Sequence, residues 1–128
     1  MAEIKYISLV VRDYDEAIAW YTQTLGFELI EDTALSETKR WVLVQPQGGQ
    51  GMALLLAKAA NEDQSQAIGN QTGGRVFLFM HVEDFDSEYV RMRKEGVIFL
   101  EEPRDEIYGK VVVFEDLYGN KWDMIQPA

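Results

Sequence analysis

Alternating apolar and polar residues mark the beginning of each half of the chain. Residues 6–15 read YISLVVRDYD and residues 77–86 read FLFMHVEDFD, with apolar residues at matching positions. Apolar residues at every second position predict a β-strand with one buried face. Each stretch runs into a segment with apolar residues at helical spacing, which ends at Gly26 or at Gly96. We therefore expect a strand followed by a helix in both halves.

The two halves stay similar beyond these helices. Three further strand-like segments follow in each half, in the matching pairs Phe27–Ile30 with Val97–Leu100, Arg40–Val44 with Lys110–Phe114, and Met52–Leu56 with Trp122–Gln126. Successive elements that recur in the same order in both halves indicate an internal duplication. The sequence therefore predicts an α+β fold built from two tandem βαβββ modules.

The expected modules cover about residues 4–57 and 75–127, and the polar residues 58–74 link them. A module of this size is too small to form a stable core alone, so the two should pack side by side in one domain of residues 1–128. We expect a curved, cup-shaped mixed sheet with the helices outside. The linker is rich in Asn, Gln and Gly, and a helical turn is expected near residues 64–68.

Short polar motifs predict where the helices begin. Asp13, with Glu16 three residues later, and Asp84 are suited to cap the N-termini of the two helices. We assign Asp13 and its neighbour Asp15 to capping, not to catalysis. The charged residues 101–102 and 105–106 are expected in an exposed loop.

Strand alternation also predicts which side chains face the cup. In the first strand, alternate residues should face the helix, which leaves Tyr6, Ser8 and Val10 on the cup side. The same parity in the second half turns Phe77, Phe79 and His81 into the cup. A concave apolar pocket with a few polar groups is the usual site for a small molecule. These side chains are therefore candidate ligand-binding residues, and the alternative is that the aromatic rings only fill the cavity.

Three segments carry a resemblance to a known family: SLVVRDYDEAIAWYTQTLGFEL (residues 8–29), HVEDFD (residues 81–86) and FEDLYGNKWDMIQP (residues 114–127). They resemble the vicinal oxygen chelate superfamily, which includes glyoxalase I, bleomycin-resistance proteins, metal-dependent fosfomycin-resistance enzymes and extradiol dioxygenases. The resemblance spans nearly the whole chain and implies the paired-module fold and a homodimer. It does not imply one chemistry, because the superfamily contains isomerases, epimerases, dioxygenases, thiol transferases and proteins that only bind.

The resemblance also implies where a metal ion would bind. In metal-using members the first and last strands of each module supply the ligands, and these positions fall on Tyr6, Ala53, Phe77 and Asp123. Only Asp123 is a carboxylate, and a catalytic transition metal needs at least three protein ligands. We therefore predict that neither a metal nor another cofactor is bound. The alternative is a metal site assembled elsewhere from Asp123 and His81.

Composition narrows the classes of function further. The 128 residues carry a net charge of −10, no Cys and a single His, which is His81. The absence of Cys excludes disulfides, thiolate metal sites and a Cys nucleophile. The negative charge disfavours nucleic-acid and membrane partners, and the apolar runs are too short to cross a bilayer. Because no leader pattern follows Met1, we expect a cytoplasmic protein, whose acidic surface aids solubility and would also attract a cationic ligand.

Several charged side chains are candidates for chemistry in the cup. An unpaired Asp123 in an apolar wall would have a raised pKa and could accept a proton or hold a cation. The alternative is a structural pairing with Lys110, Arg40 or Tyr6. His81 could be a general base or a structural group. Arg40 and Arg75 could hold an acidic ligand or could be paired with carboxylates.

These observations leave three functions open. The first is a metal-free protein that binds a small-molecule ligand, similar to the bleomycin-resistance branch, in a groove shared by two subunits. The second is a metal-dependent enzyme of the lyase, isomerase or dioxygenase type, which the missing metal donors disfavour. The third is a metal-free enzyme that uses Asp123 and His81 as acid and base. We expect the first.

Overall fold

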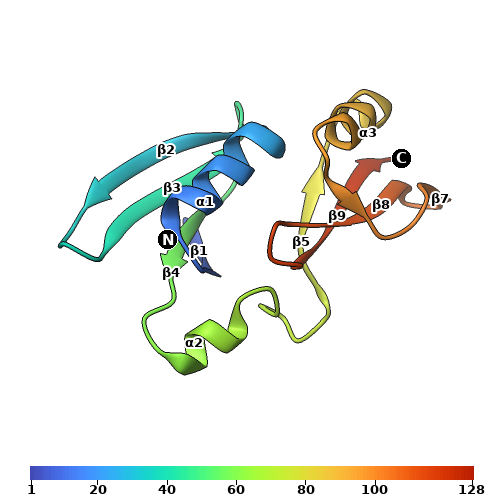
Figure 1. Cartoon of the computed structure of the whole chain (residues 1–128). Coiled ribbons are helices and arrows are strands. Elements are labelled where there is room, and N and C mark those ends of the chain that lie inside the picture. Colours follow the sequence, from blue (N-terminus) through green and yellow to red (C-terminus); the bar gives the residue numbers. More distant parts are fainter. The chain divides into compact units, whose positions relative to one another are not determined.

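Two β-sheets, each with a helix against one face, make up the fold (Figure 1). The computed structural model describes residues 1–128. The chain is an α+β protein with two βαβββ modules, as the sequence predicts. It forms two compact units, Met1–Ile68 and Gly69–Ala128. None of its helices has the length and apolar character needed to span a membrane.

The first unit contains four strands and three helical segments. In chain order these are β1 (Tyr6–Val11), α1 (Tyr14–Ala19), the π-helical turn η1 (Trp20–Thr24), β2 (Phe27–Ala34), β3 (Arg40–Pro46), β4 (Ala53–Lys58) and α2 (Glu62–Ala67). The sheet order is β1-β4-β3-β2, with β1 parallel to β4 and the other pairs antiparallel. The helical turn expected near residues 64–68 is α2, which begins and ends slightly earlier.

The first helix begins and ends where the sequence predicts. The Asp13 side chain accepts a hydrogen bond from the backbone N of Glu16 at 2.9 Å, which confirms its role as the N-cap. Helix α1 continues into η1, where the backbone N of Leu25 donates to the carbonyl oxygen of Trp20, five residues earlier, at 2.9 Å. Gly26 follows with φ of 88°, a left-handed conformation that favours glycine. Hydrogen bonds at Asp13 and at Leu25 therefore stabilise the two ends of this helical segment.

The second unit repeats this plan with one additional strand. It contains β5 (Val76–His81), α3 (Phe85–Lys94), β6 (Ile98–Phe99), β7 (Arg104–Glu106), β8 (Gly109–Glu115) and β9 (Lys121–Pro127). The sheet order is β5-β9-β8-β6, with β5 parallel to β9 and with β7 paired to β8. The exposed loop expected at residues 105–106 is wrong, because these residues pair with Gly109 and Lys110 in a hairpin. The charged residues remain exposed within that strand.

Aromatic rings form the core between α3 and the second sheet. Asp84 caps α3 as predicted, since its side chain accepts a hydrogen bond from the backbone N of Ser87 at 3.2 Å. The ring of Phe114, which is fully buried, stacks on Trp122 at a centroid distance of 5.8 Å. It also meets Phe99 at 6.1 Å. These contacts fix the helix-facing side of β8 and β9.

A buried polar turn joins β8 to β9 and sets the position of the last strand. Oδ1 of Asp116 accepts hydrogen bonds from the backbone N atoms of Tyr118 and Asn120, both at 2.9 Å. Oδ2 of Asp116 accepts a further bond from Nδ2 of Asn120 at 2.9 Å. The Asn120 side chain in turn accepts from the backbone N of Gln71 at 3.1 Å. Because both carboxylate oxygens of Asp116 accept hydrogen bonds from the turn, this network fixes where β9 begins.

Candidate functional site

The face of the first sheet opposite α1, called here the first open face, carries an aromatic pair. The strand register places Tyr6 across from Ala53 and Ser8 across from Leu55. The ring of Tyr6, which is 47% exposed, meets Trp41 edge-on at a centroid distance of 5.8 Å. Sequence reasoning missed Trp41, although alternation along Arg40–Val44 could have placed it on this face.

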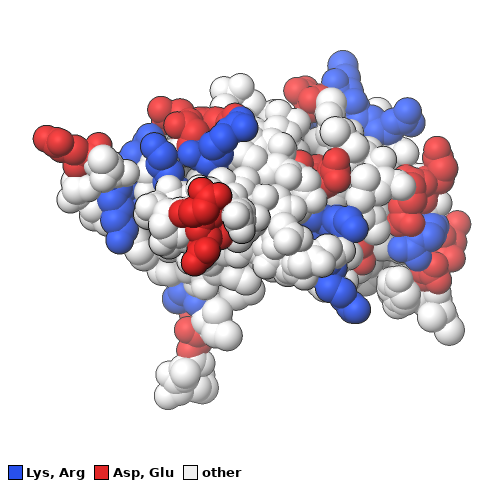
Figure 2. All heavy atoms as spheres, turned by 60° about the horizontal axis from the view of Figure 1, so that its bottom comes forward, with Lys and Arg blue, Asp and Glu red and all other residues white.

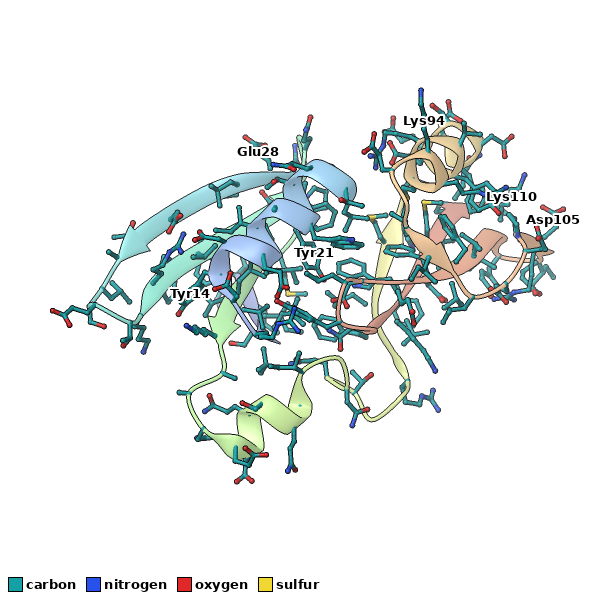
Figure 3. The ribbon with its side chains drawn as sticks, viewed as in Figure 1. Tyr14, Tyr21, Glu28, Lys94, Asp105 and Lys110 are labelled. Atoms are coloured by element: carbon teal, nitrogen blue, oxygen red, sulfur yellow. The ribbon has the colours of Figure 1, made fainter.

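A pocket of about 630 Å³ adjoins this aromatic pair within the first unit. Its lining residues are Tyr14, Leu35, Thr38, Lys39, Arg40, Trp41, Leu55, Leu56, Ala57, Lys58, Ala59, Ala60 and Gln64. Tyr14 reaches from α1 to β3, where its hydroxyl accepts a hydrogen bond from the backbone N of Arg40 at 3.1 Å (Figure 3). The volume lies within the range of small-molecule sites, and the walls combine aromatic and aliphatic groups with a few polar ones.

Arg40 is paired with carboxylates and is therefore not free to hold an acidic ligand. Its guanidinium binds Asp32 in a two-pronged contact, with Nη2 to Oδ2 at 2.6 Å and Nε to Oδ1 at 3.1 Å. It also bonds Asp15 at 2.9 Å and lies 5.1 Å from the ring centre of Tyr14. These hydrogen bonds raise the pKa of Arg40 above its already high value. Acidic and basic side chains are likewise interspersed on the face drawn in Figure 2.

The face of the second sheet opposite α3, the second open face, brings three predicted residues together. Phe79 lies directly across from Asp123, and His81 lies across from Ile125. Phe79 is 63% exposed, and His81 is exposed as well. His81 and Asp123 are diagonal neighbours on adjacent strands, so their Cα atoms lie roughly 8 Å apart. A small ligand between them could contact both side chains.

Phe77 departs from the alternation that the sequence predicts. The pairing of β5 with β9 shifts between Val76 and Leu78, so that one additional residue of β5 is accommodated there. Such a bulge re-aims a side chain. The ring of Phe77 meets Trp122 edge-on at 6.3 Å. As a result Phe79, and not Leu78, lies across from Asp123.

Asp123 is buried without a structural partner at one of its oxygens. The residue is 9% exposed, and its Oδ1 accepts no hydrogen bond from the protein. Of the partners named as alternatives, Lys110 bonds Asp86 at 2.8 Å, Arg40 bonds Asp32 and Asp15, and the ring of Tyr6 contacts Trp41. Burial raises the pKa of Asp123 above its ordinary value, and the charge of Glu101 adds to this, whereas the charge of Arg104 opposes it.

The positions at which the family resemblance implies metal ligands do not suit a metal ion. Ala53 has no donor atom, and neither Phe77 nor its neighbour Phe79 can bind a metal. Asp123 is the only carboxylate in the set, and Tyr6 is the only other side chain with an oxygen. In addition, no cluster of three or more His, Asp or Glu side chains in the structure is arranged to hold a metal. A catalytic metal needs at least three protein ligands, which this set does not supply.

Comparisons with known proteins agree with this fold. The model of the Glyoxalase/Bleomycin resistance protein/Dioxygenase superfamily matches residues 3–124. An uncharacterized protein from Shewanella frigidimarina (strain NCIMB 400) is 54% identical over 124 residues, which cover 96% of this chain and 92% of that protein. The crystal structure of UcmS2 is 30% identical, with 98% of both chains covered and a TM-score of 0.85. The crystal structure of TnmS3, an antibiotic binding protein from Streptomyces sp. CB03234, is 25% identical, with 100% of this chain and 98% of that chain covered and a TM-score of 0.79.

Proposed function

Because this chain belongs to the Glyoxalase/Bleomycin resistance protein/Dioxygenase superfamily, we propose that it binds a small organic molecule without a metal ion. The observation that carries the proposal is the pocket of about 630 Å³ beside Trp41 in the first unit. A pocket of this size takes a ligand of drug-like dimensions. The description of the similar TnmS3 as an antibiotic binding protein supports a binding role.

Each unit contributes its own candidate ligand-binding residues to this proposal. They are Tyr6, Ser8, Phe77, Phe79, His81 and Asp123 from the sequence, together with Trp41 and Leu55 from the structure. Tyr6 is supported by its ring contact with Trp41, and Ser8 by its position across from Leu55. Both Trp41 and Leu55 line the pocket. Exposed rings of this kind supply a large contact area to a flat ligand.

The metal-free part of the proposal rests on the donor set. An alanine and a phenylalanine stand where a metal-using member would supply ligands, so at most two oxygen-bearing side chains remain, Tyr6 and Asp123. Elemental analysis of protein purified without chelators tests this directly. We expect Ni, Zn, Mn and Fe far below one atom per chain, and a stoichiometric metal would overturn the proposal.

Binding itself can be tested with a defined panel of probes. Bleomycin, proflavine, acridine and 9-anthracenecarboxylate vary in size and charge. A ligand of the folded state raises the melting temperature in proportion to the logarithm of its concentration. We expect at least one aromatic probe to do so and to quench tryptophan emission. The quenching should be lost in Trp41→Phe and kept in Trp20→Phe, because Trp20 does not line the pocket. No response to any probe would count against a binding function.

A second candidate function is supported by the second open face. Asp123 and His81 share this face at diagonal positions, and burial raises the pKa of Asp123, so the pair is suited to acid–base chemistry. In that case Asp123→Asn and His81→Gln should both abolish turnover of a substrate while the protein still folds. Unchanged turnover in either variant would exclude this role for the pair.

A further inference from the structure

We propose that Asp123 anchors a protonated amine of the ligand, with the ring of Phe79 as the second contact. The inference rests on the proposed binding function and adds the chemical class of a ligand at the second open face. It concerns the second unit alone and is carried by three observations there: an unpartnered carboxylate oxygen, an excess of negative charge and an exposed ring.

The first observation is the unused hydrogen-bonding capacity of Asp123. A buried polar atom normally has a partner, and the few exceptions call for an explanation. Oδ1 of Asp123 is buried and accepts no hydrogen bond from the protein, although the residue is more than nine-tenths buried. An ionised carboxylate only accepts hydrogen bonds, so the group that completes it must be a donor.

The second observation is the balance of charge around Asp123. The backbone N of Val113, which lies across from Asp123, donates to Oε1 of Glu101 at 3.1 Å. Arg104 binds both oxygens of Glu101 at 3.0 Å and Oε1 of Glu106 at 2.6 Å. Arg104 therefore bonds two carboxylates, and together with Asp123 this part of the unit has three carboxylates and one guanidinium. The net negative charge of this group would attract a cation to Asp123 and disfavour an anion.

The third observation is the ring beside the carboxylate. Phe79 lies directly across from Asp123 on β5 and is 63% exposed. A carboxylate next to the face of an aromatic ring suits an ammonium group, because the ring attracts the cation and the carboxylate accepts its N–H. An exposed ring changes rotamer in picoseconds to nanoseconds, so Phe79 can adjust to contact a ligand at Asp123.

The test compares two flat dyes of similar ring size at mildly alkaline pH, where proflavine is a cation and acridine is neutral. Isothermal titration calorimetry measures the affinity of each dye for the full chain and for Asp123→Asn. A hydrogen bond to a charged group predicts that proflavine binds roughly 10- to 100-fold more tightly than acridine. In Asp123→Asn this preference should disappear, while the affinity for acridine should stay within about twofold.

Asp105→Asn is the matched control, because it removes the same charge from the same unit. Asp105 on β7 lies across from Lys110 on β8 (Figure 3). Nζ of Lys110 lies 5.3 Å from the ring centre of Phe85 in α3. Asp105 therefore lies on the helix-facing side, and its substitution should leave the preference for proflavine intact. Phe79→Leu supplies an independent check. The ratio of the affinity for proflavine to the affinity for acridine should fall about threefold in this variant.

The outcomes separate this inference from the proposed function. If wild-type protein binds both dyes equally, or if Asp123→Asn keeps the preference for proflavine, the amine anchor is refuted while the binding function stands. If wild-type protein binds neither dye, the proposed function fails for aromatic ligands and the inference fails with it. If Asp123→Asn does not fold, Phe79→Leu takes its place as the test. A ratio of proflavine affinity to acridine affinity that is unchanged from wild type then refutes the amine anchor.

Discussion

Replacing Asp123 with asparagine should make the ligand-free protein more stable. The Asp123 carboxylate is buried, and its Oδ1 has no hydrogen bond from the protein. Leaving such a group unsatisfied costs roughly 1–3 kcal/mol, of which the attraction of Arg104 recovers a part. Removing the charge should therefore raise the free energy of unfolding by about 1 kcal/mol, or the melting temperature by roughly 3–6 °C. Asp105→Asn, on an exposed strand, should change neither quantity.

The dependence of this gain on pH provides a stricter test. Because burial raises the pKa of Asp123 above its ordinary value of 3.8, the folded state keeps a proton that the unfolded state releases. Wild-type stability then falls as the pH rises from about 3.8 through the raised pKa, whereas the variant lacks this loss. Thermal unfolding of both proteins across acidic and neutral pH should show a difference in melting temperature between them. This difference should grow as the pH rises through this window and should vanish below it. A variant that is less stable at neutral pH would mean that Asp123 has a stabilising partner.

Four further changes test the core, the turn, the ion pairs and the donor set. Phe114→Ala should lower the free energy of unfolding in urea by about 3–5 kcal/mol, because the ring is fully buried against Trp122 and Phe99; a loss below 1 kcal/mol would contradict this packing. Asp116→Ala removes the acceptor of three hydrogen bonds and should cost about 2–4 kcal/mol, measured in the same way. Arg40→Met should cost only about 1 kcal/mol, and salt should reduce the loss. Dialysis against EDTA should leave the thermal unfolding curve unchanged, and a lower melting temperature would reveal a bound metal.

The order of elements could be predicted because the chain contains it twice. Each half has an aspartate where its helix begins and a glycine where it ends, and the structure confirms the capping roles of Asp13 and Asp84. The short strand β7 was missed because Arg-Asp-Glu has no apolar alternation. Only its backbone pairing with β8 makes it a strand. The union of both sheets in one cup stays a prediction.

The candidate site could be predicted only as far as simple alternation holds. It placed Tyr6 and Ser8 correctly opposite α1, and Phe79 and His81 opposite α3. It failed for Phe77, because a bulge is set by pairing with a distant strand and leaves no local signal. Nothing in the sequence indicated that Oδ1 of Asp123 has no hydrogen-bond partner, because this depends on which carboxylate a long, flexible cation such as Lys110 binds.

The π-helical turn η1 explains an irregularity of the duplication. Gly26 follows Asp13 by 13 residues, whereas Gly96 follows Asp84 by only 12. Both aspartates cap a helix, so the first helix must hold one residue more between equivalent ends. The wide turn takes up this residue through the bond from Leu25 to Trp20, without moving the cap or the strand that follows. Two helices of unequal length can in this way occupy the equivalent interval between a capping aspartate and a terminating glycine.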